Sequence, residues 1–358
     1  MLKLISLRQL LDHAADSGYG VPAFNISNME QGIAIMNSAK KCDSPVILQA
    51  SLNVRNRYAG DQMIVAIVNA LAKMYPNNPI CLHQDHGHTE SACVSAVSSG
   101  FTSAMMDGSL MSDGKTPSSY SYNVDITSRV SQIAHWTGAS IEGELGVLGS
   151  LESGEASDED GSGAVGKLDK EQLLTDPDEA ADFVKKTKVD ALAIACGTSH
   201  GANKFTREPD DNILSINQIK AIHERLPDTH LVMHGSSSVP QSLQEMINEY
   251  GGDMPQTWGV PVSEIERGIK YGVRKVNIDT DCRMAMSGAM RRFAKLNPKV
   301  FDPREFILAS MKELEKLVSD RFERFGTAGN AKKIHPISLA EMADRYADGA
   351  FEPRVKAA

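Results

Sequence analysis

The sequence predicts one α/β domain over residues 1–358, folded as a (β/α)8 TIM barrel with a C-terminal helical extension at about 302–358. Eight short apolar runs alternate with segments of helical periodicity, which is typical of parallel β/α units. The polar residues that carry chemistry stand directly after those runs, as they do at the mouth of such a barrel. A barrel takes about 250 residues, so the surplus falls in loop insertions and the extension.

The eight predicted strands are short and rich in Val, Ile, Leu and Ala. They cover residues 21–25, 45–50, 80–85, 102–107, 140–145, 191–195, 230–234 and 273–277. The helical segments between them begin with recognisable residues: Asp61, Thr89, and Asp176 followed by Pro177. Glycines stand where helices are expected to end, at Gly100, Gly138, Gly251 and Gly272.

Two segments stand outside this alternation. Residues 149–166 are rich in Gly, Ser, Asp and Glu and predict a mobile loop, of the kind that closes over a barrel mouth on substrate. Residues 305–324 and 338–348 predict two helices of the extension, which pack either on the barrel or on a neighbouring subunit. We expect a homo-oligomer, a dimer or a larger assembly.

Composition limits the class of protein. Hydrophobic residues make up 41% of the chain, and the formal net charge is −9 with scattered Lys and Arg. Nucleic acid and anionic membranes are therefore not expected partners. The N-terminal segment lacks the pattern of a signal peptide, so we expect a cytoplasmic protein. Five cysteines without Cys-x-x-Cys spacing predict reduced, mostly buried thiols.

Three histidines indicate a metal site. His86, His200 and His234 each follow an apolar run that predicts a buried strand. Imidazoles that come from three strand ends of a barrel can converge on one metal ion and leave a coordination position open for substrate. Taken alone, each histidine is better explained as a hydrogen-bonded core residue. Their shared placement favours the metal.

Further polar residues stand at the same ends of the predicted strands. A barrel stabilised by apolar packing has no need for so many polar groups at one rim, although any one of them could be a turn or capping residue. The set comprises Asn25, Ser51, Asp85, Asp107, Glu144, Asn277 and Asp279.

The motifs at these positions resemble those of class II, metal-dependent fructose-1,6-bisphosphate aldolases of the Calvin-cycle type. They span nearly the whole chain: VPAFN at 21–25, HQDHG at 83–87, MDG at 106–108, EGELG at 142–146, DEDG at 158–161, GTSHG at 197–201, HGSS at 234–237 and NIDTD at 277–281. The resemblance implies reversible cleavage of fructose 1,6-bisphosphate to dihydroxyacetone phosphate and glyceraldehyde 3-phosphate through a zinc-stabilised enediolate, in glycolysis, gluconeogenesis or the Calvin cycle.

The resemblance also implies a cofactor and its ligands. Catalytic Zn²⁺ would be bound by His86, His200 and His234. Asp107 and Glu144 correspond to a second or alternative divalent metal position. Whether a monovalent cation, Na⁺ or K⁺, assists phosphate binding as in the family stays open.

Aldol cleavage also needs groups that exchange protons. Asp85, next to His86, is well placed to serve the C4 hydroxyl, or else it orients a metal-bound histidine. The resemblance points to Glu159 in the mobile loop as the acid or base for the carbon that becomes the nucleophile. Nearby acids compete for that role: Glu152, Glu155 and Asp158. Glu142 should face the same side of its strand as Glu144, and a partner of a metal ligand is one role for it.

The sugar bisphosphate substrate needs two phosphate sites. Barrels commonly bind phosphate in the loops after strands seven and eight, through backbone N–H groups. The loop after strand seven carries Gly235, Ser236 and Ser237, and the loop after strand eight carries Asn277, Ile278, Asp279 and Thr280. The family pattern adds Asn25, Ser51 and Gly201 as substrate-binding residues. The second phosphate would meet Ser51, Arg55, Lys204 or the pair Lys332 and Lys333.

Several alternatives remain. A Schiff-base aldolase would use a strand lysine, for which Lys275 is the candidate. A barrel metal-dependent hydrolase and a non-catalytic metal-binding scaffold protein are the others. Within the favoured class, tagatose 1,6-bisphosphate and sedoheptulose 1,7-bisphosphate share the reacting end of the substrate.

Overall fold

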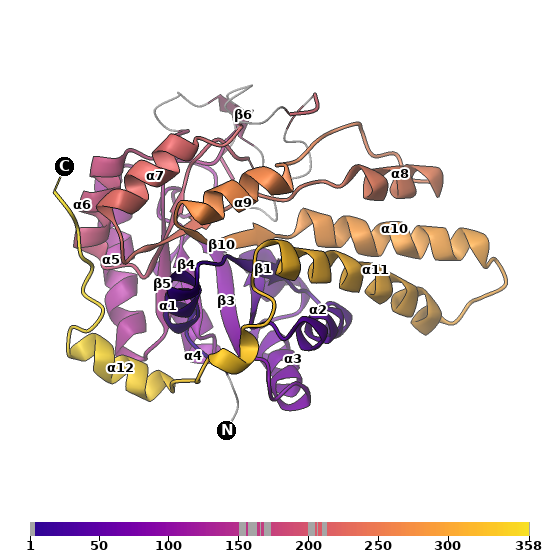
Figure 1. Cartoon of the computed structure of the whole chain (residues 1–358), viewed down its shortest axis with the longest axis horizontal. Helices are drawn as coiled ribbons and strands as arrows, with labels where there is room; N and C mark the ends of the chain where they lie inside the picture. Colours follow the sequence, from indigo (N-terminus) through magenta and orange to yellow (C-terminus); the bar gives the residue numbers. More distant parts are fainter. Residues whose placement is uncertain are drawn as a thin grey trace.

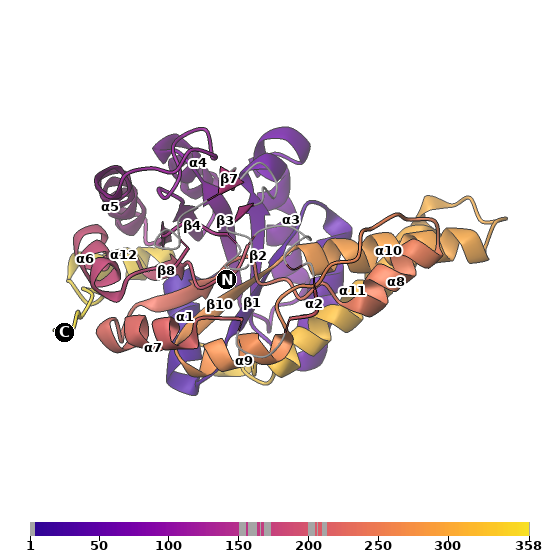
Figure 2. The same cartoon turned by 90° about the horizontal axis from the view of Figure 1, so that it is seen from above.

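Eight parallel strands close into a barrel in the computed structural model of the chain (Figures 1 and 2). The structure describes residues 4–149, 155–156, 163–164, 166–167, 173–199, 205, 207–209 and 213–357. The strand order around the barrel is β1-β10-β9-β8-β5-β4-β3-β2. The strands are β1 Val21–Asn25, β2 Val46–Ser51, β3 Ile80–Gly87, β4 Ser103–Met106, β5 Ser140–Leu145, β8 Ala191–Ile194, β9 His230–Met233 and β10 Val273–Ile278.

Helices surround the barrel and continue beyond it. They are α1 Leu7–Ser17, α2 Met29–Cys42, α3 Asp61–Met74, α4 Glu90–Ser99, α5 Tyr120–Trp136, α6 Pro177–Thr187, α7 Ile216–Arg225, α8 Gln241–Glu249, α9 Val262–Lys270, α10 Thr280–Leu296, α11 Pro303–Arg324 and α12 Leu339–Ala347, with a π-helical turn η1 Val54–Tyr58 and a 3-10 turn η2 Ala331–Lys333. No helix among the described residues is long and apolar enough to cross a bilayer.

All eight predicted strands are confirmed, with ends shifted by no more than two residues. Helix signals are confirmed as well: Thr89 and Asp176 accept hydrogen bonds from the first turns of α4 and α6. Asp61 differs, because it is the first residue of α3 and Gly60 takes the capping position. All five cysteines are free thiols, and four of them are buried.

The predicted loop at 149–166 contains strand structure where it is described. Strand β6 (Glu155–Ala156) pairs antiparallel with β7 (Gly166–Lys167). The remaining residues of that loop lie outside the described ones, except 149 and 163–164. Closure of the loop on substrate stays a prediction.

Helix α1 closes the N-terminal end of the barrel. Its apolar face and Ile5, two residues before the helix, pack with side chains that point into the barrel from six strands. The N-terminal helix is therefore a plug at this end of the barrel, and the C-terminal mouth lies at the other end. The α1 side of this cluster consists of Ile5, Leu7, Leu10, Leu11 and Ala14, and the strand side includes Val21, Ala23, Ile47, Cys81, Met105, Ala191, Ala193 and Val232.

Polarity inside the barrel changes along the strands. Because successive strand residues point to opposite faces, every second residue of a barrel strand faces the interior. On β3 the inward residues run Cys81, His83 and Asp85, from the plugged end toward the mouth. On β10 they are Lys275 and Asn277. Apolar packing near the plug thus gives way to polar side chains at the mouth.

The C-terminal extension packs on the same chain. Helix α11 packs against α10 and α2, and α12 packs against α5. Figure 1 shows α10 and α11 projecting together beyond the barrel wall, with α8 alongside. The two predicted helices of the extension are confirmed as α11 and α12.

Candidate active site

Asp85 lies at the mouth of the barrel as a buried carboxylate surrounded by amide donors. Asn25 donates to its Oδ2 at 2.9 Å, Gln49 donates to the same oxygen at 3.3 Å, and Asn277 donates to Oδ1 at 3.0 Å. Burial alone would raise the pKa of Asp85, but His86, His234 and these donors outweigh it and lower the pKa to about 2. Asp85 is therefore an ionised acceptor held in one orientation.

His86 follows Asp85 in a strained backbone conformation. Its φ of 43° is left-handed, and the register between β3 and β4 is irregular at this point. Strained backbone conformations are common at functional sites, because they direct a side chain to a position that a regular strand would not allow. Nδ1 of His86 lies 3.0 Å from Oδ2 of Asp107, so Nε2 is the nitrogen that can face a metal.

Asp107 and Glu144 form a carboxylate pair beside His86. The Ser109 hydroxyl lies between them, 2.7 Å from Oδ1 of Asp107 and 3.2 Å from Oε1 of Glu144. Burial and the nearby charge of Asp107 raise the pKa of Glu144 well above its ordinary value. Burial opposes a charge on His86, but its hydrogen bond to Asp107 and the surrounding carboxylates raise its pKa to about 10. The same negative field would attract a divalent cation.

His234 stands immediately after β9 and its ring lies edge-on to that of His86, with centroids 4.6 Å apart. Its Nε2 lies 2.7 Å from Oε1 of Glu142, and Nδ2 of Asn277 lies 3.0 Å from its Nδ1. The imidazole is thus held from two sides, by groups on β5 and β10.

The described residues contain two groups whose ligand atoms lie within 4.8 Å of one another: Asp85, His86 and His234, and His86, Asp107 and Glu144. Two imidazoles with their second nitrogens on carboxylates fit a bound transition metal or zinc, since ligating histidines commonly donate their other N–H to a carboxylate. The predicted third ligand, His200, lies outside the described residues, and so do Gly201 and Glu159.

The predicted phosphate loops lie next to this group. Gly235 has a φ of 60°, and a Cβ there would stand 2.5 Å from the backbone oxygen of Ser199, so the two loops are in close contact. Ser236 donates to the backbone oxygens of Met233 and Asn277, at 3.0 and 2.8 Å. Its hydroxyl therefore joins the ends of β9 and β10.

The residues after β10 open a long helix. Asp279 occupies the N-cap position of α10 without a side-chain capping hydrogen bond, and Thr280 is the first residue of the helix, so its first-turn backbone N–H groups lie next to the end of β10. Asp279 also forms an ion pair with Arg283 at 2.5 Å. Ile278 has its side chain buried in the core, so only its backbone can serve substrate, and Ser237 is buried as well.

A pocket of about 530 Å³ lies between the start of α10 and η1. It is lined by Asn25 and Asp279 from the predicted site, together with the guanidinium groups of Arg57 and Arg283. Ser51, at the end of β2, accepts a hydrogen bond from the backbone N–H of Val54, the first residue of η1. The end of β2 thereby fixes one wall of this pocket.

Two predicted candidates for the second phosphate are wrong. Arg55 is buried and pairs with Asp61 through two hydrogen bonds of 2.7 and 2.8 Å, so it joins η1 to α3. Lys332 and Lys333 lie in η2, where the neighbouring Ala331 bonds to the backbone of Asp43. Asp43 ends α2 just before β2 begins, which places the lysine pair at the plugged end of the barrel. Lys204 lies outside the described residues.

Three further groups hold the site together, and two of them, Gln49 and Ser109, were not predicted from the sequence. Gln49 donates to Asn25 at 2.7 Å and contacts Asp85, and Ser109 links the two acids. Lys275 forms an ion pair with Glu142 at 2.9 Å inside the barrel. Gln49 could have been predicted from the alternation of strand side chains, because it precedes Ser51 by two residues on β2 and faces the same side of the strand.

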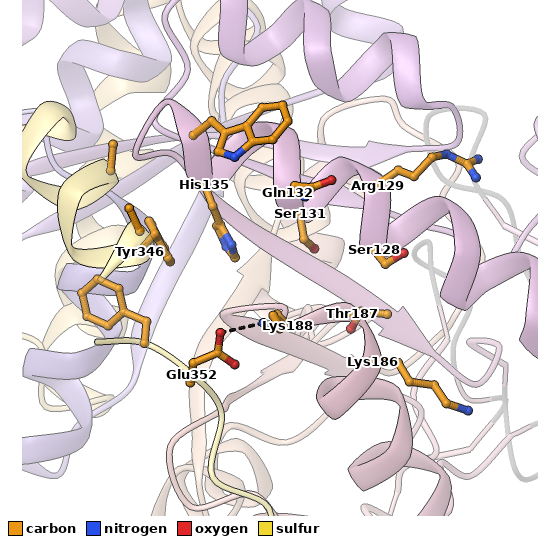
Figure 3. A pocket seen from close by; sticks show the side chains of 14 residues that line it. Ser128, Arg129, Ser131, Gln132, His135, Lys186, Thr187, Lys188, Tyr346 and Glu352 are labelled. Atoms are coloured by element: carbon orange, nitrogen blue, oxygen red, sulfur yellow. Dashed lines mark hydrogen bonds and ion pairs between the residues drawn. The ribbon is translucent and has the colours of Figure 1, made fainter. Parts of the chain in front are cut away.

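A second hollow, of about 410 Å³, lies away from this site (Figure 3). It is lined by the C-terminal ends of α5 and α6 and by α12, and the ion pair of Lys188 with Glu352 at 2.6 Å crosses it. These helix ends precede β5 and β8, so the hollow lies toward the plugged end. Among the described residues, none of the predicted site residues lines it.

Comparison with known proteins agrees with this geometry. The family model for class II fructose-bisphosphate aldolase matches residues 5–330. The chain is 65% identical over 353 residues to fructose-bisphosphate aldolase 2 of Cereibacter sphaeroides, covering 99% of each chain. It is 57% identical over 348 residues to fructose-bisphosphate aldolase class 2 of Synechocystis, covering 97% of each.

A solved structure shares the fold. The YdjI aldolase from Escherichia coli K12 superposes with a TM-score of 0.69 at 23% identity, covering 92% of this chain and 99% of that one. The family model and the full-length relatives are consistent with a metal site at the barrel mouth. This chain belongs to the metal-dependent class II fructose-bisphosphate aldolase family.

Proposed function

We propose that the chain catalyses reversible aldol cleavage of fructose 1,6-bisphosphate to dihydroxyacetone phosphate and glyceraldehyde 3-phosphate. The observation that carries the proposal is the buried group of Asp85, His86 and His234 at the end of the barrel opposite to α1. Full-length relatives at 57–66% identity carry the name of this activity.

We propose Zn²⁺ as the resident metal, held by His86, His234 and His200, with Asp107 and Glu144 as a second or alternative position. Three neutral imidazoles are a usual donor set for catalytic zinc, which keeps an open position for substrate. When bound, the metal would withdraw electrons from the ketone carbonyl and stabilise the negative charge left by cleavage.

Asp85 would take the proton of the C4 hydroxyl in the cleavage direction and return it to the aldehyde oxygen in condensation. As the C3–C4 bond breaks, its electron pair stays on C3 and the C4 oxygen becomes the aldehyde. The amides of Asn25 and Asn277 keep the carboxylate aimed toward the cluster. A positioned carboxylate that is already ionised accepts this proton without prior deprotonation.

Glu159 would exchange the proton on C3. It lies in the segment between β6 and β7, outside the described residues, and its assignment rests on the resemblance of the motif. Glu155 in β6 is the matched alternative. Isotope exchange at the C–H of dihydroxyacetone phosphate, measured for Glu159→Ala and Glu155→Ala side by side, decides between them. If neither variant changes exchange, the base lies on the barrel rim.

The two phosphates would bind in two neighbouring regions of the mouth. One would meet the loop of Gly235 to Ser237 and the first turn of α10, where N–H groups and the helix dipole favour an anion. The pocket that contains Arg57 and Arg283 supports binding of the other. Ser51, Asn25, Gly201, Asn277 and Asp279 complete the proposed substrate set.

Lys275 is a poor candidate for a Schiff base. Its side chain is 0% exposed and its ammonium group pairs with Glu142 below the site. A metal-dependent hydrolase and a non-catalytic metal-binding scaffold both lack support from the relatives. Borohydride trapping with substrate tests the first alternative, and chelation tests the others.

One assay tests the proposal as a whole. Aldol cleavage is measured with the bisphosphates of fructose, tagatose and sedoheptulose, with metal content determined on the same sample. We expect one zinc per chain and the highest kcat/KM for fructose 1,6-bisphosphate. Preference for another of the three sugars would change the substrate, and absence of cleavage with all three would contradict the aldolase assignment.

We propose a homo-oligomer in the cytoplasm. Support for oligomerisation comes from the projecting α10 and α11, where Leu296 and Phe301 are 63% and 93% exposed (Figure 1). Exposed apolar groups of this size on a projecting element favour a partner surface. Sedimentation of the wild type beside Phe301→Ser measures the assembly state, and a monomeric wild type would contradict the proposal.

A further inference from the structure

Below the mouth, the barrel interior contains a buried line of charged and polar groups. Oε1 of Glu142 lies 2.7 Å from Nε2 of His234, and Oε2 lies 2.9 Å from Nζ of Lys275. Glu142 and Lys275 are both 0% exposed. Residues of β5 and β10 and the residue that follows β9 thus form one contact chain that ends at a proposed metal ligand.

Glu142 determines which nitrogen of His234 carries hydrogen. A carboxylate whose other oxygen pairs with a lysine is an acceptor, so the 2.7 Å contact assigns N–H to Nε2. The lone pair is then on Nδ1, which lies 3.0 Å from Nδ2 of Asn277, beside Asp85 and His86. The nitrogen that can bind a metal therefore faces the cluster.

Lys275 lowers the free-energy cost of burying the carboxylate of Glu142. Transfer of a lone carboxylate into a protein interior costs several kcal/mol, and a paired cation offsets much of that cost. His83 lies 3.6 Å from the same Oε2 and bonds to Ser103 through its other nitrogen at 2.9 Å. Glu142 is thus held from below while its other oxygen faces His234.

We propose that Glu142, held in place by Lys275, is a positioning residue that selects Nδ1 of His234 as the metal-binding nitrogen and fixes the plane of its ring. Glu142 touches neither substrate nor metal and acts through His234 alone. The inference rests on the proposed function, because it assumes a metal at His234. Carboxylates in this position also raise the basicity of the ligand, which strengthens metal binding.

Paired substitutions separate positioning from mere structural support. Glu142→Leu alone would leave the Lys275 ammonium buried without a counter-ion, so it is combined with Lys275→Met. The result is an uncharged pair of similar volume, a replacement that is often neutral for stability. The matched variant combines Glu142→Gln with Lys275→Met and keeps an oxygen that can accept from Nε2–H. The two double variants differ at a single side chain.

Zinc affinity is measured by competition with a chromogenic chelator, and Co²⁺ bound to the same proteins reports ligand geometry through its visible spectrum. We expect the combination of Glu142→Leu with Lys275→Met to weaken Zn²⁺ binding by about 10- to 100-fold and to alter the Co²⁺ spectrum. The variant with Glu142→Gln should recover part of the affinity and a spectrum closer to that of the wild type.

Asp190→Asn is the control for loss of a buried carboxylate–histidine contact. Asp190 lies 3.0 Å from Nε2 of His135 near the plugged end, remote from the cluster. Its substitution should lower stability and leave Zn²⁺ affinity unchanged. Wild-type Zn²⁺ affinity and Co²⁺ spectrum in the variant with Glu142→Leu and Lys275→Met would overturn the inference alone. A wild-type chain that binds no Zn²⁺ would overturn the proposed function, and this inference with it.

Discussion

At the scale of single residues, the orientation of Asp85 depends on amides rather than on cations. Two of its donors, Asn25 and Asn277, come from the strands next to each other across the closure of the barrel, β1 and β10. Neutral donors fix the carboxylate without neutralising it, so the negative charge remains for proton transfer or for a metal. Asp85 also belongs to the metal-type group, and a substitution separates these two roles.

Asp85→Asn should lower kcat by about 100-fold or more, the usual scale for a lost general acid or base, while zinc remains bound. The amide has nearly the same shape, so packing at the mouth is preserved. Steady-state cleavage and zinc content are measured on the same preparation. Loss of zinc, with near-normal turnover once excess zinc is supplied, would instead identify Asp85 as a residue that supports the metal.

Residues at the carboxyl ends of the strands were predictable from the sequence, and the pairing of charged side chains deeper inside the barrel was not. His86, Asp85, Asp107 and His234 follow apolar runs, and the barrel rule places such residues at the mouth. Lys275 lies inside a strand, and a sequence does not state that a lysine there will be buried against Glu142. That pairing depends on register between strands distant in sequence.

At the scale of elements, two loops of the site depend on a close approach that only glycine allows. A Cβ at Gly235 would lie 2.5 to 3.0 Å from backbone atoms of Ser199. The φ of Gly235 is also positive, at 60°. Gly251 has a φ of 90°, and a Cβ added there would meet no other atom within 4 Å. A substitution at Gly251 therefore shows the effect of backbone strain without that of a steric clash.

Gly235→Ala should therefore reduce turnover, whereas Gly251→Ala should not. Each substitution costs about 1 kcal/mol for an L-residue in the left-handed region. Only the first also displaces the loop of residues 197–199, which leads to the predicted ligand His200. Unfolding free energy and kcat/KM are measured for both. Equal kinetic losses in the two variants would show that the contact with Ser199 has no catalytic consequence.

Helix α12 is joined to the barrel through Asp190. Tyr346 donates to Asp190 at 2.8 Å and stacks on His135, with ring centroids 3.9 Å apart. Burial alone would raise the pKa of Asp190, but His135, Arg8 and the N–H of Ile141 outweigh burial and hold the pKa below 3.8. The folded state thus favours the ionised carboxylate.

Asp190→Asn should lower the unfolding free energy by about 3 kcal/mol near neutral pH, as expected when a buried pair loses one partner. Because the folded-state pKa is depressed, this stabilisation is fully present above pH 3.8 and is lost as pH falls below that value through the folded pKa. Urea unfolding of wild type and variant across this range measures the difference. A difference that stays constant below pH 3.8 would contradict the ionic explanation.

Strands and most helix ends were predictable because their signals are local: a run of apolar residues, a capping Thr89, a proline after Asp176. The placement of η2 was not, and neither was the pairing of β6 with β7. Short elements contain too few residues for a period to appear. Their position depends on contacts with parts of the chain far away in sequence, such as the bond between Ala331 and Asp43.

At the scale of the whole molecule, the barrel concentrates negative charge at its open end. Asp85, Asp107 and Glu144 are buried within reach of two imidazoles, and Lys275 is engaged by Glu142 below them. The plug formed by α1 lies at the other end of the barrel from these groups. The fold and the family were predictable from motif order along the chain, but the balance of charge inside the barrel required the structure.

Removal of the metal should abolish cleavage and destabilise the fold together. Without a cation, the buried carboxyl groups of the mouth lie close together, and burial and the charge of Asp107 raise the pKa of Glu144 well above its ordinary value. A ligand present at about 1,000 times its Kd stabilises the native state by about 4 kcal/mol, so the chelated protein should unfold at a lower temperature. Added Zn²⁺ should restore both properties in the same titration.

Activity and Tm are followed against free zinc, with the Asp190→Asn variant as a protein of lowered stability whose zinc dependence is unchanged. Turnover by a preparation shown to be free of metal would contradict the metal-dependent mechanism, and restored Tm without restored turnover would indicate a metal that is structural only.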